Sequence, residues 1–595
     1  MQRPDRRDLV AFAGLTIGLL AWFAGPGIVR GFVFPVGPDA PVYLWWTRLV
    51  GVEGLSAVTR PGVPALALVL SGTLHLPVSA VLAALEIAGG VLTGVTAAAL
   101  VRMSRSDDRP TWILAGALVG TFSVHVATGY LATLVFGVLF LAALATLAVG
   151  TRRGAVAAAI LLGAGAIAHP RFLAVGAAIL LIAAGLSWRD DRTETRRILG
   201  AITGGGLILA VAGLALLVGP SPLLVDTSRD AFLRRVGLDD ILHRAYLSRF
   251  LARWTRYAPW GALPLVAYAL PPRGPRRTVD RILLAWVIVA AGGALFSAVT
   301  GLLPIDRFVT FAFAVPILAA CGAVRIVRSP RIPRTLAAAI ATALSVAMLV
   351  GAGGAWLRQE PFLEDRDLAA LATANAVASA APETTLVFPV GSEQSAFLLT
   401  LAGNAIRATL PPERIRDAVI VVVGSSPGVE GEAIVRRTAL DQEEALAAHG
   451  GRAQRILVVP FAERIGLGGP WTLIGDDVAI DPAIAPASSA DPVAPYAPWL
   501  PLAATLVALA SLAAVGWAWS RTLVADVVGA AALAPAIGIG VTILIAFVAE
   551  RIGVPLRGSV GPTAIAALSL ASGPMLVRVA ARTRGSSRRG RHRRT

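Results

Sequence analysis

The sequence has few of the charged residues that a soluble protein of its length needs on its surface. Only 15% of its 595 residues are charged, 56% are hydrophobic, and the mean hydropathy is +0.72. This proportion of polar side chains is too small to cover the surface of a soluble globular protein, so a soluble protein is excluded. Apolar runs long enough to cross a hydrocarbon core recur along the chain. Because backbone groups in lipid must pair internally, these runs are expected to be helices.

The sequence also lacks lysine, so all 53 basic residues are arginine. A net charge of +17 raises the question of a nucleic-acid partner. However, the arginines lie in short clusters between apolar runs, which is the pattern of the positive-inside rule. We therefore expect no nucleic-acid binding. The single cysteine, Cys321, lies in an apolar run, where it is expected to pack as a small hydrophobic side chain.

The arginine clusters give the predicted topology. We expect about 14 membrane-spanning helices. The predicted spans are 9–24, 77–101, 111–126, 129–150, 154–168, 172–188, 198–218, 258–271, 282–302, 308–324, 336–356, 499–519, 524–547 and 563–580. When these spans alternate, every strong arginine cluster falls on one side, which the positive-inside rule assigns to the cytoplasm. Both termini are then cytoplasmic, in a multi-pass protein of the plasma membrane.

The composition changes in the segment 357–498, where charges return and apolar runs shorten. The runs at 386–390, 418–426 and 455–461 are rich in valine and isoleucine and predict buried strands. The stretches at 365–380 and 431–451 have helical spacing. Strands that alternate with helices predict an α/β domain, here outside the cytoplasm.

The predicted fold is thus an α-helical polytopic membrane protein with an extracytoplasmic α/β domain. We divide the chain into a multi-span domain at 1–356, the α/β domain at 357–498, C-terminal membrane helices at 499–580 and a basic disordered cytoplasmic tail at 581–595. The tail is expected to orient the chain and to be attracted to anionic lipid.

The most informative loop follows the first span and reads FVFPVGPDAPVYLWWTRLV. Asp39 lies in a turn framed by proline and glycine, and Tyr43, Trp45, Trp46 and Arg48 follow it. A carboxylate at the membrane face suits an acceptor hydroxyl that must lose a proton. Indole rings suit a stacked sugar, and a guanidinium suits a phosphate. The alternative is a helix N-cap followed by a belt of interfacial aromatic residues.

In this loop the sequence resembles the GT-C superfamily of membrane glycosyltransferases, which carry an acidic residue in the first external loop. The stretch GPDAPVYLWWTRL is similar to that pattern, and Asp39 occupies the position of the catalytic base. Three further stretches, at 122–144, 165–175 and 302–322, are also similar to the superfamily. The resemblance covers 1–356 and implies a sugar donor linked to polyprenyl phosphate and an active site outside the cytoplasm.

Two departures from the family pattern matter for the chemistry. Many relatives have paired acids in this loop, whereas Asp39 is followed by no other acid until Glu53. A divalent metal usually needs two or more carboxylates, so a metal cofactor remains possible but is not indicated. There is no WWDxG motif in the 357–498 segment, which argues against the oligosaccharyltransferase subgroup.

Other candidate residues lie on the same predicted face. His169 and Arg171 at a helix end, and Asp306 and Arg307 in a tight turn, are candidates to meet the carrier phosphate. The segment 226–257 is predicted to form interfacial amphipathic helices that carry His243 and Arg244. For each of these, a local structural role is the alternative. Glu86 is an acid inside a predicted span and is therefore a functional candidate by default.

Three functions are compatible with these observations. The first is a glycosyltransferase that moves a sugar from a polyprenyl-phosphate carrier to a glycan, lipid or protein acceptor, with the lipid bilayer as its setting. The second is a non-catalytic scaffold with the same membrane fold. The third is a lipid or glycolipid flippase, for which we expect repeated halves and several charges buried midway in spans. No internal repeat is found, and Glu86 is nearly alone as such a charge.

Overall fold

The computed structural model describes two long helical parts and four strands between them. The described residues are 5–37, 39–58, 60–104, 108–122, 129–217, 277–300, 305–329 and 496–575, with short pieces between 265 and 361 and strands between 385 and 473. The helices are α1 (Arg6–Arg30), α2 (Ala40–Glu53), η1 (Leu55–Ala57), α3 (Gly62–Leu74), α4 (Val78–Ser104), α5 (Arg109–Phe122), α7 (Leu131–Ala148), α8 (Arg152–Ala168), α9 (Pro170–Ser187), α10 (Arg192–Leu217), α14 (Thr278–Thr300), α15 (Ile305–Thr310), α16 (Ala314–Val327), α21 (Leu500–Leu523) and α22 (Val527–Arg551).

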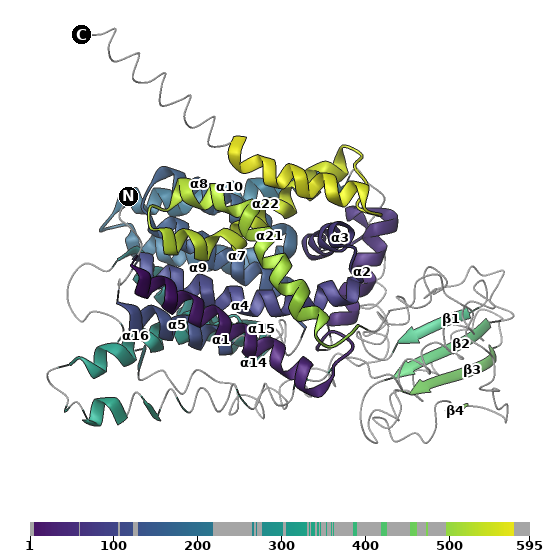
Figure 1. Ribbon diagram of the computed structural model, residues 1–595, viewed down its shortest axis with the longest axis horizontal. Helices are drawn as coiled ribbons and strands as arrows, with labels where there is room; N and C mark the ends of the chain where they lie inside the picture. The colour runs from purple at the N-terminus through teal and green to yellow at the C-terminus, as the bar shows by residue number, and fades with distance from the viewer. Residues whose placement is uncertain are drawn as a thin grey trace, which may run out of the picture.

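The helices form one body around α4 and α7 (Figure 1). Most of each of these two helices is buried, with 94% of the apolar window inside the structure, whereas the corresponding fractions are 28% for α1 and 22% for α10. The peripheral helices expose large apolar side chains, among them Val29, Leu207 and Leu214. Outward apolar surface of this kind is expected where the solvent is lipid. Among the described residues, nine helices are long and apolar enough to cross a membrane.

Helices that were not expected from the sequence fill most of the stretch between the first two predicted spans. Helix α1 continues to Arg30, and α2 and α3 follow before α4 begins. The α3 residues from Gly62 to Ala67 are all buried. With 13 residues, α3 is shorter than a span, which explains why the length criterion passed over it. The count of about 14 spans stays a prediction, since most of 258–271 and most of 336–356 lie outside the described residues.

Helices α21 and α22 return the chain to this body after the strands and pack closely on each other. A Cβ added to Gly516 would lie 1.8 Å from the carbonyl oxygen of Ala534, and one added to Gly538 would lie 2.0 Å from that of Leu512. Glycine at both positions therefore allows the two backbones to approach, as small residues do at membrane helix contacts. The Thr505 hydroxyl, 3.1 Å from the Ala84 carbonyl oxygen, joins α21 to α4.

Three helices begin with side-chain caps at the end of the body where the N-terminus lies. The Asp5 carboxylate accepts a hydrogen bond from the Arg7 N–H at 3.0 Å, and the Asp526 carboxylate accepts one from the Gly529 N–H at 2.9 Å. The Thr151 hydroxyl caps α8 in the same way. These side chains satisfy N–H groups that the first turn of a helix leaves without an intrahelical partner.

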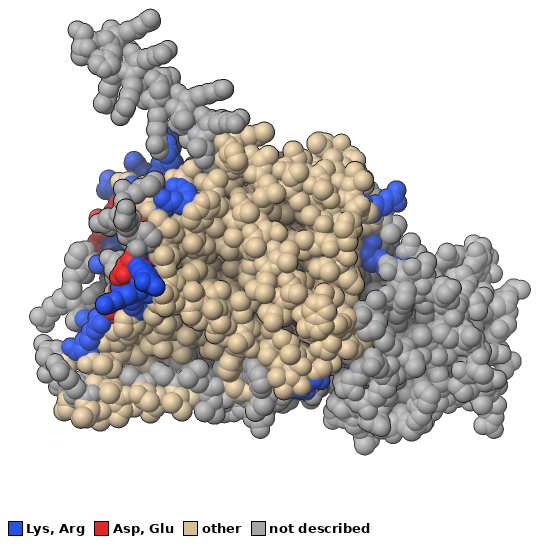
Figure 2. All heavy atoms as spheres, viewed as in Figure 1, with Lys and Arg blue, Asp and Glu red and all other residues tan. Residues whose placement is uncertain are grey.

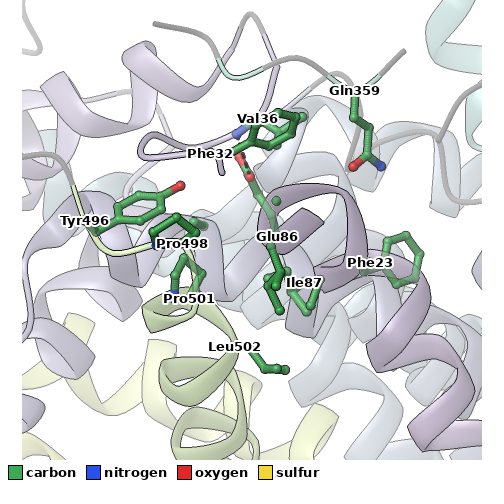
Figure 3. A pocket seen from close by; sticks show the side chains of 14 residues that line it. Phe23, Phe32, Val36, Glu86, Ile87, Gln359, Tyr496, Pro498, Pro501 and Leu502 are labelled. Atoms are coloured by element: carbon green, nitrogen blue, oxygen red, sulfur yellow. Dashed lines mark hydrogen bonds between the residues drawn. The ribbon is translucent and has the colours of Figure 1, made fainter. Parts of the chain in front are cut away.

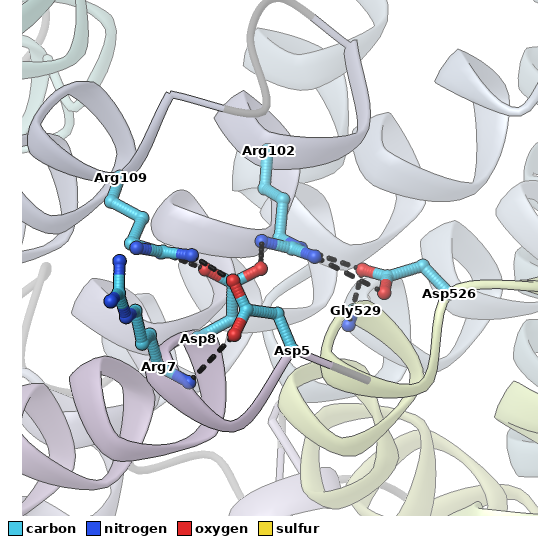
Figure 4. Close-up of polar contacts among 7 residues, drawn as sticks. All are labelled: Asp5, Arg7, Asp8, Arg102, Arg109, Asp526 and Gly529. Atoms are coloured by element: carbon cyan, nitrogen blue, oxygen red, sulfur yellow. Dashed lines mark hydrogen bonds and ion pairs between the residues drawn. The ribbon is translucent and has the colours of Figure 1, made fainter. Parts of the chain in front are cut away.

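A cluster of ion pairs joins α1, α4, α5 and α22 at this end (Figure 4). Arg102 donates to Asp8 at 2.8 Å and to Asp526 at 2.7 Å, and Arg109 donates to Asp8 and Asp5. The side chains of Arg102 and Asp8 are only 13% and 11% exposed. Burial alone raises the pKa of Asp526, but hydrogen bonds from Arg102 and from backbone N–H groups outweigh it and hold that pKa below its usual value.

Further ion pairs bring the other predicted arginine loops to the same end. Arg281 at the start of α14 pairs with Asp190 at 2.7 Å, and Arg328 after α16 pairs with Asp108 at 2.8 Å. In Figure 2, charged side chains gather mainly at this end, and a wide band across the middle of the face is uncharged. The structure thus places these loops at one end of the helical body. That this end faces the cytoplasm stays a prediction.

The four strands form a sheet in the order β1-β2-β3-β4. They span β1 (Thr385–Pro389), β2 (Ala418–Gly424), β3 (Ala453–Pro460) and β4 (Thr472–Leu473). The pairs β1–β2 and β2–β3 are parallel, and β3–β4 is antiparallel. The first three strands coincide with the apolar runs expected to be strands. Parallel neighbours require long crossover connections, but the expected helices lie outside the described residues, so the α/β domain stays a prediction.

Candidate functional site

The first loop crosses the end of the body opposite the ion-pair cluster. Helix α1 ends at Gly31, which has a left-handed φ of 68° and whose N–H bonds to the Gly27 carbonyl. Phe32 and Phe34 are buried, and Phe34 is fully so. The loop is therefore packed onto the body along this stretch, and it leads directly to the first turn of α2.

Asp39 stands at the N-cap position of α2, as the structural alternative predicts. Its side chain makes no capping hydrogen bond to the helix, however, and the residue is partly exposed. The positive end of a helix dipole favours the ionised form of a carboxylate placed there. A partly exposed carboxylate at this position is within reach of a ligand and is suited to accept a proton.

Gly129 fixes the backbone on the other side of Asp39. It has a φ of +67°, and an added Cβ would lie 3.0 Å from both the Ala40 nitrogen and the Val36 oxygen. Glycine meets the φ requirement and the close approach at once. The turn before α7 is thereby pressed against the turn that carries Asp39.

We expect Gly129→Ala to lower stability by about 1–2 kcal/mol through the left-handed backbone alone. It should also shift the Asp39 backbone, because the new Cβ needs space there. Thermal unfolding and transfer rates measure the two effects. The matched control is Gly558→Ala, since Gly558 has a φ of +71° but open space around the added Cβ. Equal losses of activity in both variants would contradict the contact with the Asp39 turn.

The two described aromatic side chains of α2, Tyr43 and Trp46, are buried and pack edge-to-face with ring centroids 5.8 Å apart. Tyr43 is only 2% exposed, and its hydroxyl accepts a hydrogen bond from the Ala132 N–H at 3.0 Å in the first turn of α7. Trp46 is also buried and lies under the Arg60 guanidinium at 5.5 Å. Both predicted sugar contacts thus hold α2 in place in this structure. Arg48 is partly exposed, and the Trp45 side chain lies outside the described residues.

Glu86 lies in α4 and contacts the first loop from inside the helical body. One carboxylate oxygen accepts a hydrogen bond from the Val36 N–H at 3.2 Å. The other, Oε1, is buried and has no hydrogen-bond partner within the described part of the chain. Glu86 lines a small pocket with a volume of about 30 Å³. A pocket of this size has room for water and not for a sugar.

Two segments from either side of the strands meet at this pocket. Val36 pairs as an antiparallel bridge with Pro361, and the Tyr496 N–H donates to the Val33 carbonyl at 3.1 Å. Arg30 also donates to the Gln359 carbonyl. In Figure 3, the Tyr496 hydroxyl is directed toward the Glu86 carboxylate. The first loop is therefore held by chain that leads into the sheet and by chain that returns from it.

His169 and Arg171 lie at the corner between α8 and α9, at the same end of the body as Asp39. His169 is 3% exposed and packs edge-to-face on Phe172 with ring centroids 4.6 Å apart. Arg171 is exposed. A Cβ on Gly62 would lie 2.8 Å from the Ala168 Cα, so this corner touches the start of α3. Only Arg171 of the pair is accessible to a ligand here.

The remaining predicted residues are less defined. Asp306 and Arg307 lie in helix α15 and not in a tight turn, because the structure places helix from Ile305 onward. Their side chains lie outside the described residues, as do His243 and Arg244 entirely. Among the described residues, no group of three or more His, Cys, Asp or Glu side chains is placed to hold a metal ion.

The sequence analysis missed a charged pair at the end of α22. Glu550 pairs with Arg551 at 2.5 Å and accepts a hydrogen bond from the Leu55 N–H at 3.3 Å. Arg551 also donates to the Ala215 carbonyl at the end of α10. The pair anchors η1, just beyond α2, to two helices distant in sequence. The charges at the end of a long apolar run were the only signal available.

No protein-family model and no curated protein sequence matches the chain. Among solved structures, it is similar to the crystal structure of an oligosaccharyltransferase from Archaeoglobus fulgidus in complex with Zn and sulfate. The two share 12% identity and a TM-score of 0.48, over 75% of this chain and 67% of that chain. A TM-score this low, at this identity, does not establish a common fold or a common activity.

Proposed function

We propose that the protein is a membrane glycosyltransferase with Asp39 as its general base. It moves a sugar from a polyprenyl-phosphate carrier to a hydroxyl of a glycan, lipid or protein outside the cytoplasm. The observation that supports this proposal is the position and exposure of Asp39. The residue is partly exposed, stands at a helix N-terminus without capping it, and lies at the end of an apolar body opposite the arginine loops.

The proposed reaction needs one base and one site for the leaving phosphate. The acceptor hydroxyl loses its proton to the Asp39 carboxylate as its oxygen bonds to the anomeric carbon. The bond from that carbon to the carrier phosphate breaks, and polyprenyl phosphate leaves with the electron pair. Attack from the face opposite the leaving group inverts the anomeric centre.

Arginine side chains are suited to the negative charge that develops on the leaving phosphate. Arg48 on α2 and Arg171 at the corner before α9 are described, are at least partly exposed, and lie at the same end as Asp39. We assign them this role in the proposal. Arg307, His243 and Arg244 are further candidates on segments whose side chains are not described. The apolar outer surface of α1 and α10 suits a carrier whose long chain stays in the bilayer.

A transfer assay on the purified protein in lipid nanodiscs and vesicles tests the proposal. The substrates are a radiolabelled pentose and a radiolabelled hexose, each on polyprenyl phosphate, with cell-envelope glycans as acceptors. We expect label in the acceptor and free polyprenyl phosphate in equal amount. Transport of the labelled lipid across vesicles without product would instead indicate a flippase. Binding without turnover would indicate a scaffold, and either result would overturn the proposal.

A further inference from the structure

Glu86 is the buried acid that the proposed reaction does not use. The residue is 2% exposed, on the third turn of α4. A carboxylate in such a place is costly unless both of its oxygens find hydrogen bonds or the group is neutral. Only one oxygen is bonded to protein among the described residues, through the Val36 N–H. The residue also lines a pocket that has room for water.

The partners around this pocket come from three distant parts of the chain. Val36 belongs to the first loop and lies three residues before Asp39. Gln359 and Tyr496 belong to the segments that precede and follow the strands, and both line the pocket with Glu86. Burial raises the pKa of the Tyr496 hydroxyl, and the nearby Glu86 charge adds to that effect. Tyr496 therefore stays protonated and is able to donate a hydrogen bond.

We propose that Glu86 is a positioning residue that fastens the loop carrying Asp39 to both ends of the strand-bearing segment. One of its oxygens holds the loop backbone at Val36. The other accepts hydrogen bonds from water in the pocket, and that water accepts one from the Tyr496 hydroxyl. A water of this kind typically makes about three hydrogen bonds to buried polar groups. The first loop and the strand-bearing segment consequently move together.

A crosslinking measurement tests the junction without relying on catalysis. Val36 and Pro361 are paired across an antiparallel bridge, where Cα atoms lie at a separation that a disulfide spans. The double variant Val36→Cys with Pro361→Cys is made in a Cys321→Ala background, which removes the only native cysteine. The initial rate of crosslinking under mild oxidation in membranes then reports how often the loop and the segment are in register.

Glu86→Leu leaves the Val36 N–H without its acceptor, and we expect the crosslinking rate to fall by about tenfold or more. Glu86→Gln keeps an acceptor oxygen and supplies a polar group toward the water, so its rate should stay near that of the parent. Tyr496→Phe removes only the hydroxyl and should give an intermediate rate. The matched control is Thr96→Val, which removes another buried polar atom of α4 away from the junction.

An unchanged rate in Glu86→Leu would overturn the proposal, and an unchanged rate in Tyr496→Phe would overturn the link through that hydroxyl. If Glu86→Leu fails to fold, the crosslinking rate of Tyr496→Phe compared with that of Thr96→Val tests the proposal instead.

The effect on Asp39 rests on the proposed function and is measured separately. In the transfer assay, Glu86→Leu should lower kcat and leave KM nearly unchanged. Loss of crosslinking with normal transfer would separate the junction from catalysis.

Discussion

Replacing Asp39 with asparagine is expected to lower kcat by about 10²–10⁴-fold, the usual contribution of a general base. Asparagine keeps the size of the side chain and its hydrogen-bonding oxygen but cannot take the proton of the acceptor hydroxyl. Because the two side chains have the same shape, the substitution should change folding little. The rate of sugar transfer in nanodiscs and the thermal unfolding temperature of the same preparation measure both expectations.

The matched control for this experiment is Glu53→Gln. Glu53 is the next acid in the sequence and the last residue of α2, so the variant removes the same charge from the other end of the same helix. We expect transfer close to the parent rate. Equal rates for Asp39→Asn and the parent would contradict the assignment of the base, and equal losses in both variants would indicate a general effect of charge.

Replacing Arg102 with methionine is expected to destabilise the protein by about 2–3 kcal/mol, because it removes the charged hydrogen bonds that Asp8 and Asp526 share and leaves Asp8 with Arg109 alone. Arg102 bonds both Asp8 and Asp526 and is itself largely buried. Its loss therefore loosens the contacts between α1, α4 and α22 together. Denaturation in mixed detergent micelles, followed by tryptophan fluorescence, measures the change. Arg153→Met is the control, since Arg153 is exposed at the same end and should change stability by less than about 0.5 kcal/mol.

The size of the Arg102→Met effect should also depend on pH. An aspartate whose folded pKa lies below its unfolded value of about 3.9 stabilises the fold above that value and loses this contribution as pH falls through the folded pKa. Asp526 is such a group. The difference between parent and variant should therefore be full near neutral pH and narrow in acid. A difference that grows in acid would contradict the ion-pair interpretation.

The arrangement of the membrane helices followed from the sequence to a large extent. Apolar length and arginine position act locally, so a single sequence reveals them. The contacts of Arg102, Arg281 and Arg328 show that loops predicted to share a side do meet at one end. The first three strands could also be predicted, because a short run of valine and isoleucine favours a strand whatever it pairs with.

The sequence could not show which polar side chains would form hydrogen bonds inside the protein and so be unavailable to a ligand. Tyr43 was a reasonable sugar contact, but its hydroxyl meets an N–H at the start of α7, which lies far along the chain. Helix α3 was missed because a short apolar helix gains its stability from burial against neighbours and not from its own length. The Glu86–Val36 and Glu550–Leu55 bonds also depend on contacts between distant residues.

The pairing of Val36 with Pro361 and the bond from Tyr496 to Val33 have a consequence for how this chain tolerates change. Pro361 and Tyr496 both contact the first loop, so the two ends of the segment between them are held at neighbouring positions on the helical body. The entropy of closing such a loop grows only with the logarithm of its length. We therefore expect the helical body to fold when the segment between these two contacts is lengthened, shortened or exchanged.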